Sequence, residues 1–184
     1  LARQQILNGS LASDCESVAQ ALLQVARDDL MTRDLTLGAI RRVLQALIIH
    51  FPVYRTYISA TGRSAQDDVF FQQAMDGARP TLSEADWPVL DCVAAWLGGT
   101  PWRRKPLGRS RKILKHACVR FQQLTSPAAA KAVEDTALYR SAVLLSRNDV
   151  GYNTEQFSAP VSDFHEVNQR RLAEFPDNLL ATAP

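Results

Sequence analysis

Apolar side chains recur along most of the chain with the spacing of an amphipathic helix. In residues 34–51, the clearest stretch, they fall at i, i+3, i+4, i+7 and i+8, which places them on one helix face. Thr36 is suited to cap the start of this helix, and Pro52 is expected to end it at the preceding residue. Residues 11–27 carry the same period. The apolar face of the first stretch consists of Ile40, Val43, Leu44, Leu47 and Ile48.

Local start and stop signals predict two more helices before residue 100. The sequence Ser64-Ala65-Gln66-Asp67 resembles a capping box and predicts a helix that runs to about Ala78. Asp86 followed by Pro88 suits the first turn of the next helix, because a proline is tolerated where no N–H donor is needed. The pair Gly98-Gly99 is expected to end that helix.

Residues 100–112 differ from the rest because they combine two prolines, a glycine and dense positive charge. This composition predicts a loop, and it marks the best candidate boundary in the chain. A helix should follow, with Leu114 and Phe121 facing inward. Because Ser126-Pro127 has the order of a cap and a first-turn proline, we expect a separate helix from there to about Ser146.

The C-terminal residues predict a loop at 148–153 and a last helix from Ser162 that ends before Pro176. The short apolar run 179–182 is compatible with a buried strand. Helical signals therefore dominate from one end to the other, and the predicted fold class is mainly α.

Composition is that of an ordinary globular protein. Hydrophobic residues make up 46% of the 184 residues and charged residues 22%, so a core can form without disulfides or metals. The formal charge of +2 argues against a dedicated nucleic-acid binder, which shows a clear basic excess. Apolar runs such as Ala46-Leu47-Ile48-Ile49 are too short to span a membrane, so we expect no membrane partner.

One segment is strongly basic although the whole chain is nearly neutral. Residues 102–115 hold seven Lys or Arg side chains, which could bind phosphate or RNA. Charge runs are more often solvated loops, so the alternative function that this segment supports is a non-catalytic helical interaction module that touches nucleic acid.

The cysteines and histidines do not form a site by their spacing. Cys15, Cys92 and Cys118 lie far apart, with no second cysteine or histidine at metal-ligand distance in sequence. We interpret them as free thiols in the core of a cytoplasmic protein, with no metal and no cofactor. No Ser-His-Asp or Cys-His order indicates a nucleophile, and no carboxylate pair stands out as general acid and base.

The most informative polar pattern lies at Lys131, Glu134 and Asp135. At α-helical spacing these three side chains share a face, opposite to a stripe that contains Val133 and Ala137. Two interpretations remain open. The simpler one is a solvated salt bridge. The other is a polar cluster for a hydroxyl-rich ligand, in which the carboxylates accept hydrogen bonds and the lysine donates them.

Several longer motifs carry a family resemblance. The stretches Arg120-Phe121-Gln122-Gln123-Leu124-Thr125 and Val133-Glu134-Asp135-Thr136-Ala137 resemble the maltooligosyltrehalose synthases of the α-amylase superfamily. The resemblance covers nearly the whole chain. Its other motifs are 11–14, 51–57, 130–131, 139–140, 148–151, 164–165 with 168, and 180–182.

The resemblance implies a parent enzyme that converts the reducing-end α-1,4 linkage of a maltooligosaccharide to α,α-1,1. Its active site lies on a (β/α)8 barrel, with an Asp nucleophile, a Glu acid/base and a second Asp. By the family pattern, none of the three falls within this chain, so we expect no catalytic residue here. The chain starts at Leu1 and stops after Ala183-Pro184, so we expect it to be an inactive internal segment.

The resemblance also implies an organisation for the segment. Residues 1–110 correspond to a helical insertion domain, and residues 111–184 to helices and a short strand that return to the incomplete barrel. Lys131, Glu134, Asp135, Tyr139 and Arg140 are then expected to line or support the acceptor side of the sugar pocket. The partners are the rest of the enzyme chain and the maltooligosaccharide, and self-association is expected where the barrel is missing.

The chain departs from the family pattern at Ala132, where glycine is usual, and at Tyr152, where a second glycine is usual. These departures motivate a third alternative, a degenerate synthase-like segment that is retained for assembly.

Overall fold

The computed structural model describes residues 1–105, 107–141 and 158–178. It divides into two compact units, Leu1–Ala137 and Leu138–Pro184, which we describe separately. The predicted fold class is confirmed at the level of secondary structure, since the described residues are mainly helical. The barrel in which such a segment would sit remains a prediction.

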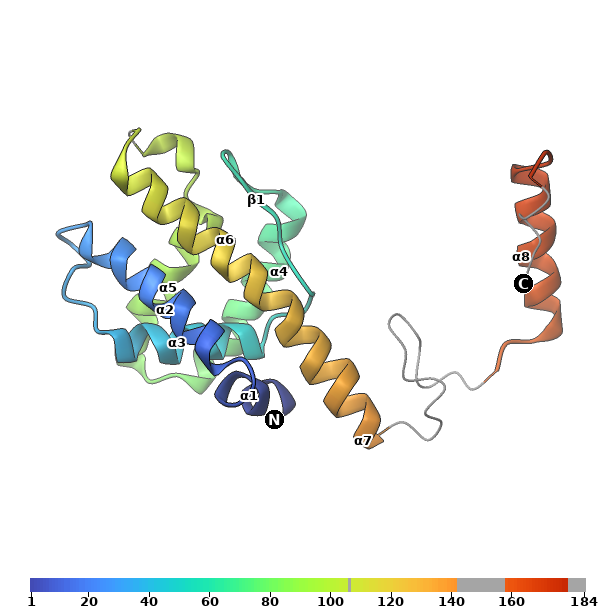
Figure 1. Cartoon of the computed structure of the whole chain (residues 1–184), viewed down its shortest axis with the longest axis horizontal. Coiled ribbons are helices and arrows are strands. Elements are labelled where there is room, and N and C mark those ends of the chain that lie inside the picture. The colour runs from blue at the N-terminus through green and yellow to red at the C-terminus, as the bar shows by residue number, and fades with distance from the viewer. Residues whose placement is uncertain (106, 142–157, 179–184) are drawn as a thin grey trace. The chain divides into compact units, whose positions relative to one another are not determined.

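The first unit contains the long helix α6, shorter helices around it, and one β-hairpin whose two strands have two residues each (Figure 1). Its α-helices are α1 Ala2–Asn8, α2 Ala12–Arg27, α3 Leu37–Ile49, α4 Ala65–Ala78, α5 Trp87–Ala94 and α6 Arg109–Ala129. The hairpin strands are β1 Ile58–Ser59 and β2 Gly62–Arg63, which pair antiparallel. Short 3-10 turns are η1 Arg79–Thr81, η2 Glu84–Asp86 and η4 Trp102–Arg104, and π-helical segments are η3 Ala95–Gly99 and η5 Ala130–Leu138.

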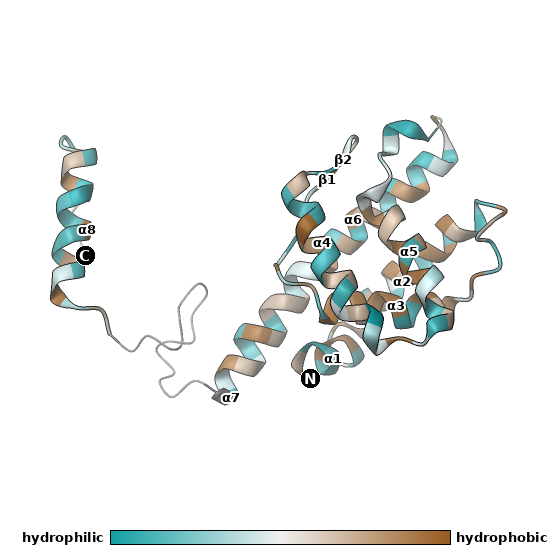
Figure 2. Ribbon diagram, turned by 180° about the vertical axis from the view of Figure 1, so that it is seen from behind, coloured by the Kyte–Doolittle hydropathy of each residue, from teal (hydrophilic) through white to brown (hydrophobic). Residues whose placement is uncertain are grey.

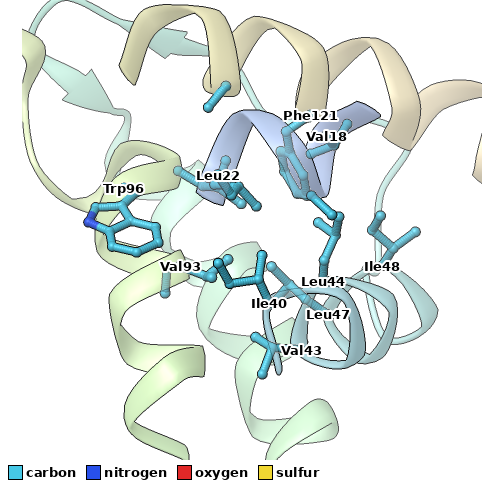
Figure 3. Packing of buried hydrophobic residues seen from close by; sticks show 14 of the residues in the cluster. Val18, Leu22, Ile40, Val43, Leu44, Leu47, Ile48, Val93, Trp96 and Phe121 are labelled. Atoms are coloured by element: carbon cyan, nitrogen blue, oxygen red, sulfur yellow. The ribbon is translucent and has the colours of Figure 1, made fainter. Parts of the chain in front are cut away.

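The core lies where α2, α3, α5 and α6 meet (Figure 3). The predicted apolar face of α3 is confirmed, because all five of its aliphatic residues are buried. Val18 and Leu22 of α2 point into the same interior as Phe121 of α6. This arrangement explains why the hydrophobic period along the chain is so regular: each of these helices buries one face against its neighbours.

Three phenylalanines join separate parts of the chain at the centre of this core. Phe51 follows α3, Phe71 lies in α4, and Phe121 lies in α6. Their ring centroids are 5.6 to 6.0 Å apart, and Phe51 meets each of the other two edge to face. Aromatic pairs at this distance and orientation contribute beyond the area they bury.

The predicted helix caps at Thr36 and Ser64 are confirmed. The Thr36 hydroxyl accepts a hydrogen bond from the Ala39 N–H at 3.2 Å, and the Ser64 hydroxyl accepts one from the Asp67 N–H at 3.1 Å. In a capping box the side chain at the position of Asp67 would bond back to the N–H of the capping residue, but here it bonds to a different backbone group. The Asp67 carboxylate accepts from the Tyr57 N–H at 3.2 Å, so it ties the extended segment 51–57 to the start of α4.

The predicted stop at Gly98-Gly99 is also confirmed. Gly98 has a φ of 116°, a left-handed conformation that side chains rarely adopt. Arg63 of β2 covers this end. Its guanidinium donates to the carbonyls of Ala94 and Leu97 at 3.2 and 3.0 Å, and lies 3.9 Å from the centroid of the Phe71 ring.

The expected helix start at Ser126-Pro127 is wrong, because α6 continues through both residues to Ala129. An interior proline costs a helix about 3 kcal/mol by removing a donor and crowding the previous turn. The cost is offset here by packing, since Phe121, Leu124 and Ala128 bury one continuous face. Ser126 does not cap the helix; its hydroxyl accepts from Arg55 Nε at 3.1 Å.

The loop expected over 100–112 is shorter than predicted, since it includes η4 and ends at Gly108, where α6 follows. The first compact unit also continues past residue 110 to Ala137, because α6 packs along α2. The assignment of 111–184 as a return to a barrel stays a prediction.

In the second unit the structure describes α7 Tyr139–Ser141 and α8 Val161–Glu174, and α8 starts one residue before the predicted Ser162. Figure 2 shows α8 as largely hydrophilic with scattered apolar positions. Val161, Phe164 and Leu172 of this helix are exposed. The loop expected at 148–153, with Tyr152, and the strand expected at 179–182 lie outside the described residues. None of the described helices has the length and hydropathy that a membrane crossing requires.

We predict that Phe121→Ala lowers the free energy of unfolding by about 3–5 kcal/mol, because it removes a fully buried ring from the centre of the core. Phe164→Ala is the control: this residue is 52% exposed, so the change in the free energy of unfolding should be within about 0.5 kcal/mol of zero. Urea unfolding followed by circular dichroism measures both. Equal losses would contradict the assigned core.

Candidate functional site

The predicted site residues fall at the end of α6, where the helix widens. Lys131, Glu134 and Asp135 lie in η5, and Tyr139 and Arg140 lie in α7 of the second unit. In η5 the hydrogen bonds span five residues instead of four, a form that is rare and frequently found at functional sites. The Thr136 hydroxyl donates to the Lys131 carbonyl at 2.7 Å across one such turn.

This widening changes which side chains are buried. Ala132 and Glu134 are buried, whereas Val133 and Ala137, the residues of the predicted core stripe, are half-buried. Lys131 and Asp135 are exposed, as are Tyr139 and Arg140. The prediction assumed 100° per residue, which holds for an α-helix but not for a π-helix. Lys131 and Glu134 therefore do not share a face, and no salt bridge joins them in the described structure.

Glu134 is the unusual member of the set because it is a charged residue that is largely buried, with 8% of the residue exposed. Burial of a carboxylate without a partner is unfavourable. Its partner is the Tyr54 hydroxyl, which donates to Glu134 Oε1. No protein group within the described residues bonds to the second oxygen, Oε2, so this oxygen keeps its capacity to accept hydrogen bonds.

The segment that carries Tyr54 is held along α6 by further side-chain bonds. The Ser126 hydroxyl donates to the Tyr54 carbonyl at 3.4 Å, and Gln122 Oε1 accepts from the Ile58 N–H at 3.2 Å. Arg55 Nε donates to Ser126 at 3.1 Å. Gln122, Ser126 and Glu134 thus anchor one side of the extended segment 54–58, and the position of Tyr54 is set by contacts at both ends.

Arg3 approaches the same segment from α1. Its Nη1 donates to the carbonyls of Ile48 and Ile49, at 3.2 and 3.0 Å, and also to that of Phe51. Ile48 and Ile49 are the last residues of α3, so their carbonyls accept no hydrogen bond from within the helix, and the Ile48 carbonyl also accepts from the Phe51 N–H at 3.2 Å. Partial burial lowers the pKa of Arg3. The hydrogen bond to Glu134 and, after it, burial raise the pKa of Tyr54, and the nearby Arg3 charge opposes them.

Sequence reasoning singled out Glu134 but missed its bond to Tyr54 and the bond between Arg55 and Ser126 that holds the neighbouring segment. A signal was present, because Tyr54 and Arg55 belong to the motif at 51–57. What the sequence could not show is that this motif lies beside η5, since Tyr54 and Glu134 are 80 residues apart.

The basic segment 102–115 occupies the loop before α6 and its first turns. Trp102 is buried, and its carbonyl accepts from Arg111 Nε at 3.0 Å. The seven cationic side chains are exposed or half-buried, and none of them forms an ion pair in the part of the chain that the structure describes.

The cysteines are free thiols, as predicted, with Cys15 and Cys118 buried and Cys92 half-buried. Burial raises the pKa of the Cys118 thiol to about 11. A thiol in this environment stays protonated at neutral pH and is a poor nucleophile. Among the described residues, no three His, Cys, Asp or Glu side chains gather as metal ligands.

We predict that Glu134→Gln moves the pKa of Tyr54 back towards the value of about 10 of a free phenol. The present raised pKa means that the bond stabilises the fold below that pKa and is lost as pH rises through it. NMR titration of labelled tyrosines measures the shift, with Tyr54→Phe to assign the signal. Glu84→Gln, at an exposed carboxylate, is the control and should leave Tyr54 unchanged. An unaltered titration in Glu134→Gln would contradict the pairing.

Comparison with known proteins gives one partial similarity. The chain is 39% identical over 61 residues to proteins of two Mycobacterium tuberculosis strains, CDC 1551 / Oshkosh and ATCC 25618 / H37Rv, each provisionally named maltooligosyl trehalose synthase. The similar stretch is 33% of this chain and 8% of each relative's length. No family profile matches the chain, and no solved structure matches it at a significant level.

Proposed function

We propose that this chain is a segment of an enzyme that isomerises the reducing-end α-1,4 linkage of maltooligosaccharides to α,α-1,1. In this proposal the segment supplies no catalytic carboxylate and shapes the acceptor side of the pocket. The partial similarity to the two mycobacterial proteins supports the enzyme class. The sequence motifs support the same class over a longer part of the chain.

The observation that carries the role of the segment is the hydrogen bond of Tyr54 to Glu134, a largely buried residue. Tyr54 fixes one of its oxygens and leaves the other to accept from a sugar hydroxyl. Lys131 and Asp135 lie on the same turn, exposed, where an ammonium donor and a carboxylate acceptor remain open to a ligand. For Tyr139 and Arg140 the proposal rests on the sequence resemblance.

Isomerisation makes a specific demand on such a segment. The glucose released by cleavage must stay in place, turn, and attack the glycosyl-enzyme before water does. This demands hydrogen-bonding groups held at fixed positions and a pocket that excludes water. A carboxylate held by tyrosine at the edge of a packed helix meets the first demand, because its orientation does not depend on the sugar.

We predict that Glu134→Ala or Lys131→Ala, in a full-length protein that contains this segment, raises hydrolysis relative to isomerisation by roughly tenfold, about 1.4 kcal/mol of transition-state stabilisation. The assay incubates the protein with maltopentaose and follows loss of reducing ends together with release of glucose. Lys112→Ala, at an exposed lysine of α6, is the control.

The unmodified protein should remove reducing ends with little free glucose. Glucose as the main product, or no reaction at all, would refute the isomerase proposal. An unchanged product ratio in both variants would refute the role of the η5 residues while leaving the enzyme class intact.

A second candidate function, binding of a polyanion, is favoured by the unpaired basic segment 102–115. Arg109, Arg111 and Lys112 lie in the first turn of α6, which itself contains no acidic residue, and the N-terminal end of a helix attracts negative charge. If this candidate is correct, the chain binds a labelled RNA oligonucleotide, and the affinity falls steeply as salt rises from about 50 to 200 mM. Substitution of Arg109 and Lys112 by Ala should then weaken binding. No salt-dependent binding would exclude it.

A further inference from the structure

A cavity opens between the first half of α2 and the C-terminal half of α6, on a different side of α6 from the Tyr54 segment. Its volume is about 230 Å³. Four apolar side chains, Leu11, Val18, Leu124 and Pro127, form part of its wall. The rest is polar and consists of Asp14, Arg120 and Gln123.

The polar side chains of this cavity form few hydrogen bonds with other described residues. Arg120 Nη2 donates to the Ser17 hydroxyl at 2.9 Å, which fixes the guanidinium against α2 and leaves its other donors open. Asp14 and Gln123 form no side-chain hydrogen bond or ion pair with any described residue. A carboxylate, a guanidinium and an amide therefore converge on one space over an apolar floor, which is the usual composition of a small-ligand site.

We propose that this cavity binds one pyranose ring of a maltooligosaccharide. The opposite charges of Asp14 and Arg120 disfavour a simple anion or cation, since either would meet a like charge. Sugar hydroxyls both donate and accept, so they can satisfy both charged groups and the amide without adding charge. The C–H face of the ring can cover Leu124 and Pro127.

The size of the cavity agrees with a ligand of one ring. Sites for drug-sized molecules have volumes of roughly 300–1,000 Å³, and this cavity is smaller. Its two walls are formed by residues 11–18 and 120–127, which are far apart in sequence and are brought together by the packing of α6 on α2. Val18 and Phe121 mark this contact in Figure 3.

The identity of the sugar rests on the proposed function, but the site does not depend on the η5 residues. It would give the enzyme a second point of attachment for the same oligosaccharide. Such a point adds affinity through effective concentration without taking part in the reaction.

The test is an NMR titration of the 184-residue chain with maltotriose, following the Gln123 side-chain amide and the Arg120 Nε–H. We expect saturable shifts at both groups, and a loss of affinity of roughly fivefold or more in Gln123→Ala and in Asp14→Asn. Gln73→Ala, at an exposed glutamine of α4, is the matched control and should bind as the unmodified chain does. All three substitutions lie at exposed helix positions and should leave the fold intact.

Shifts confined to η5, or no saturable shift at all, would overturn the proposal. So would binding of glycine at Asp14 and Arg120 without binding of maltotriose, since a zwitterion also complements opposite charges. Failure of this inference is distinguishable from failure of the proposed function. If substitution of Lys131 or Glu134 changes the product ratio but the cavity binds no sugar, only this inference is wrong. If the cavity binds sugar but the full-length protein hydrolyses maltopentaose, only the isomerase proposal is wrong.

Discussion

The contact of Phe51, Phe71 and Phe121 is the constraint on which the first unit depends. Each ring comes from a different part of the chain, and their centroids lie within 6.0 Å of one another. With Phe121 fixed, α6 lies along α2 and closes the cavity beside Asp14. With Phe51 fixed, the segment that follows it reaches η5 and presents Tyr54 to Glu134. Both candidate sites are therefore consequences of one packing arrangement.

The widened helix after Pro127 shows how local irregularity and function can coincide. An α-helix through 130–138 would place Glu134 with Lys131 on an outer face, where it would be one more solvated charge. The wider turn instead buries most of the Glu134 residue and pairs its carboxylate with a tyrosine from another segment.

Much of the secondary structure could be predicted from sequence because its causes are local. The caps at Thr36 and Ser64 and the stop at Gly98 each depend on residues within one turn. The prediction failed at Ser126-Pro127, where the local signal for a helix start is overridden because the buried face of α6 continues through these residues. The cavity at Asp14, Arg120 and Gln123 was not predicted, since neither of its walls carries a distinctive spacing.

By itself, the sequence determined that the chain is mainly helical, which faces of α2 and α3 are buried, and where several helices begin and end. These follow from the apolar period and from hydrogen bonds between near neighbours. The tertiary structure alone decided that α6 continues past Pro127, that η5 widens, and that Glu134 bonds to Tyr54. The physical reason is distance along the chain: a bond between residues 80 apart depends on how the core packs, and no local pattern encodes it.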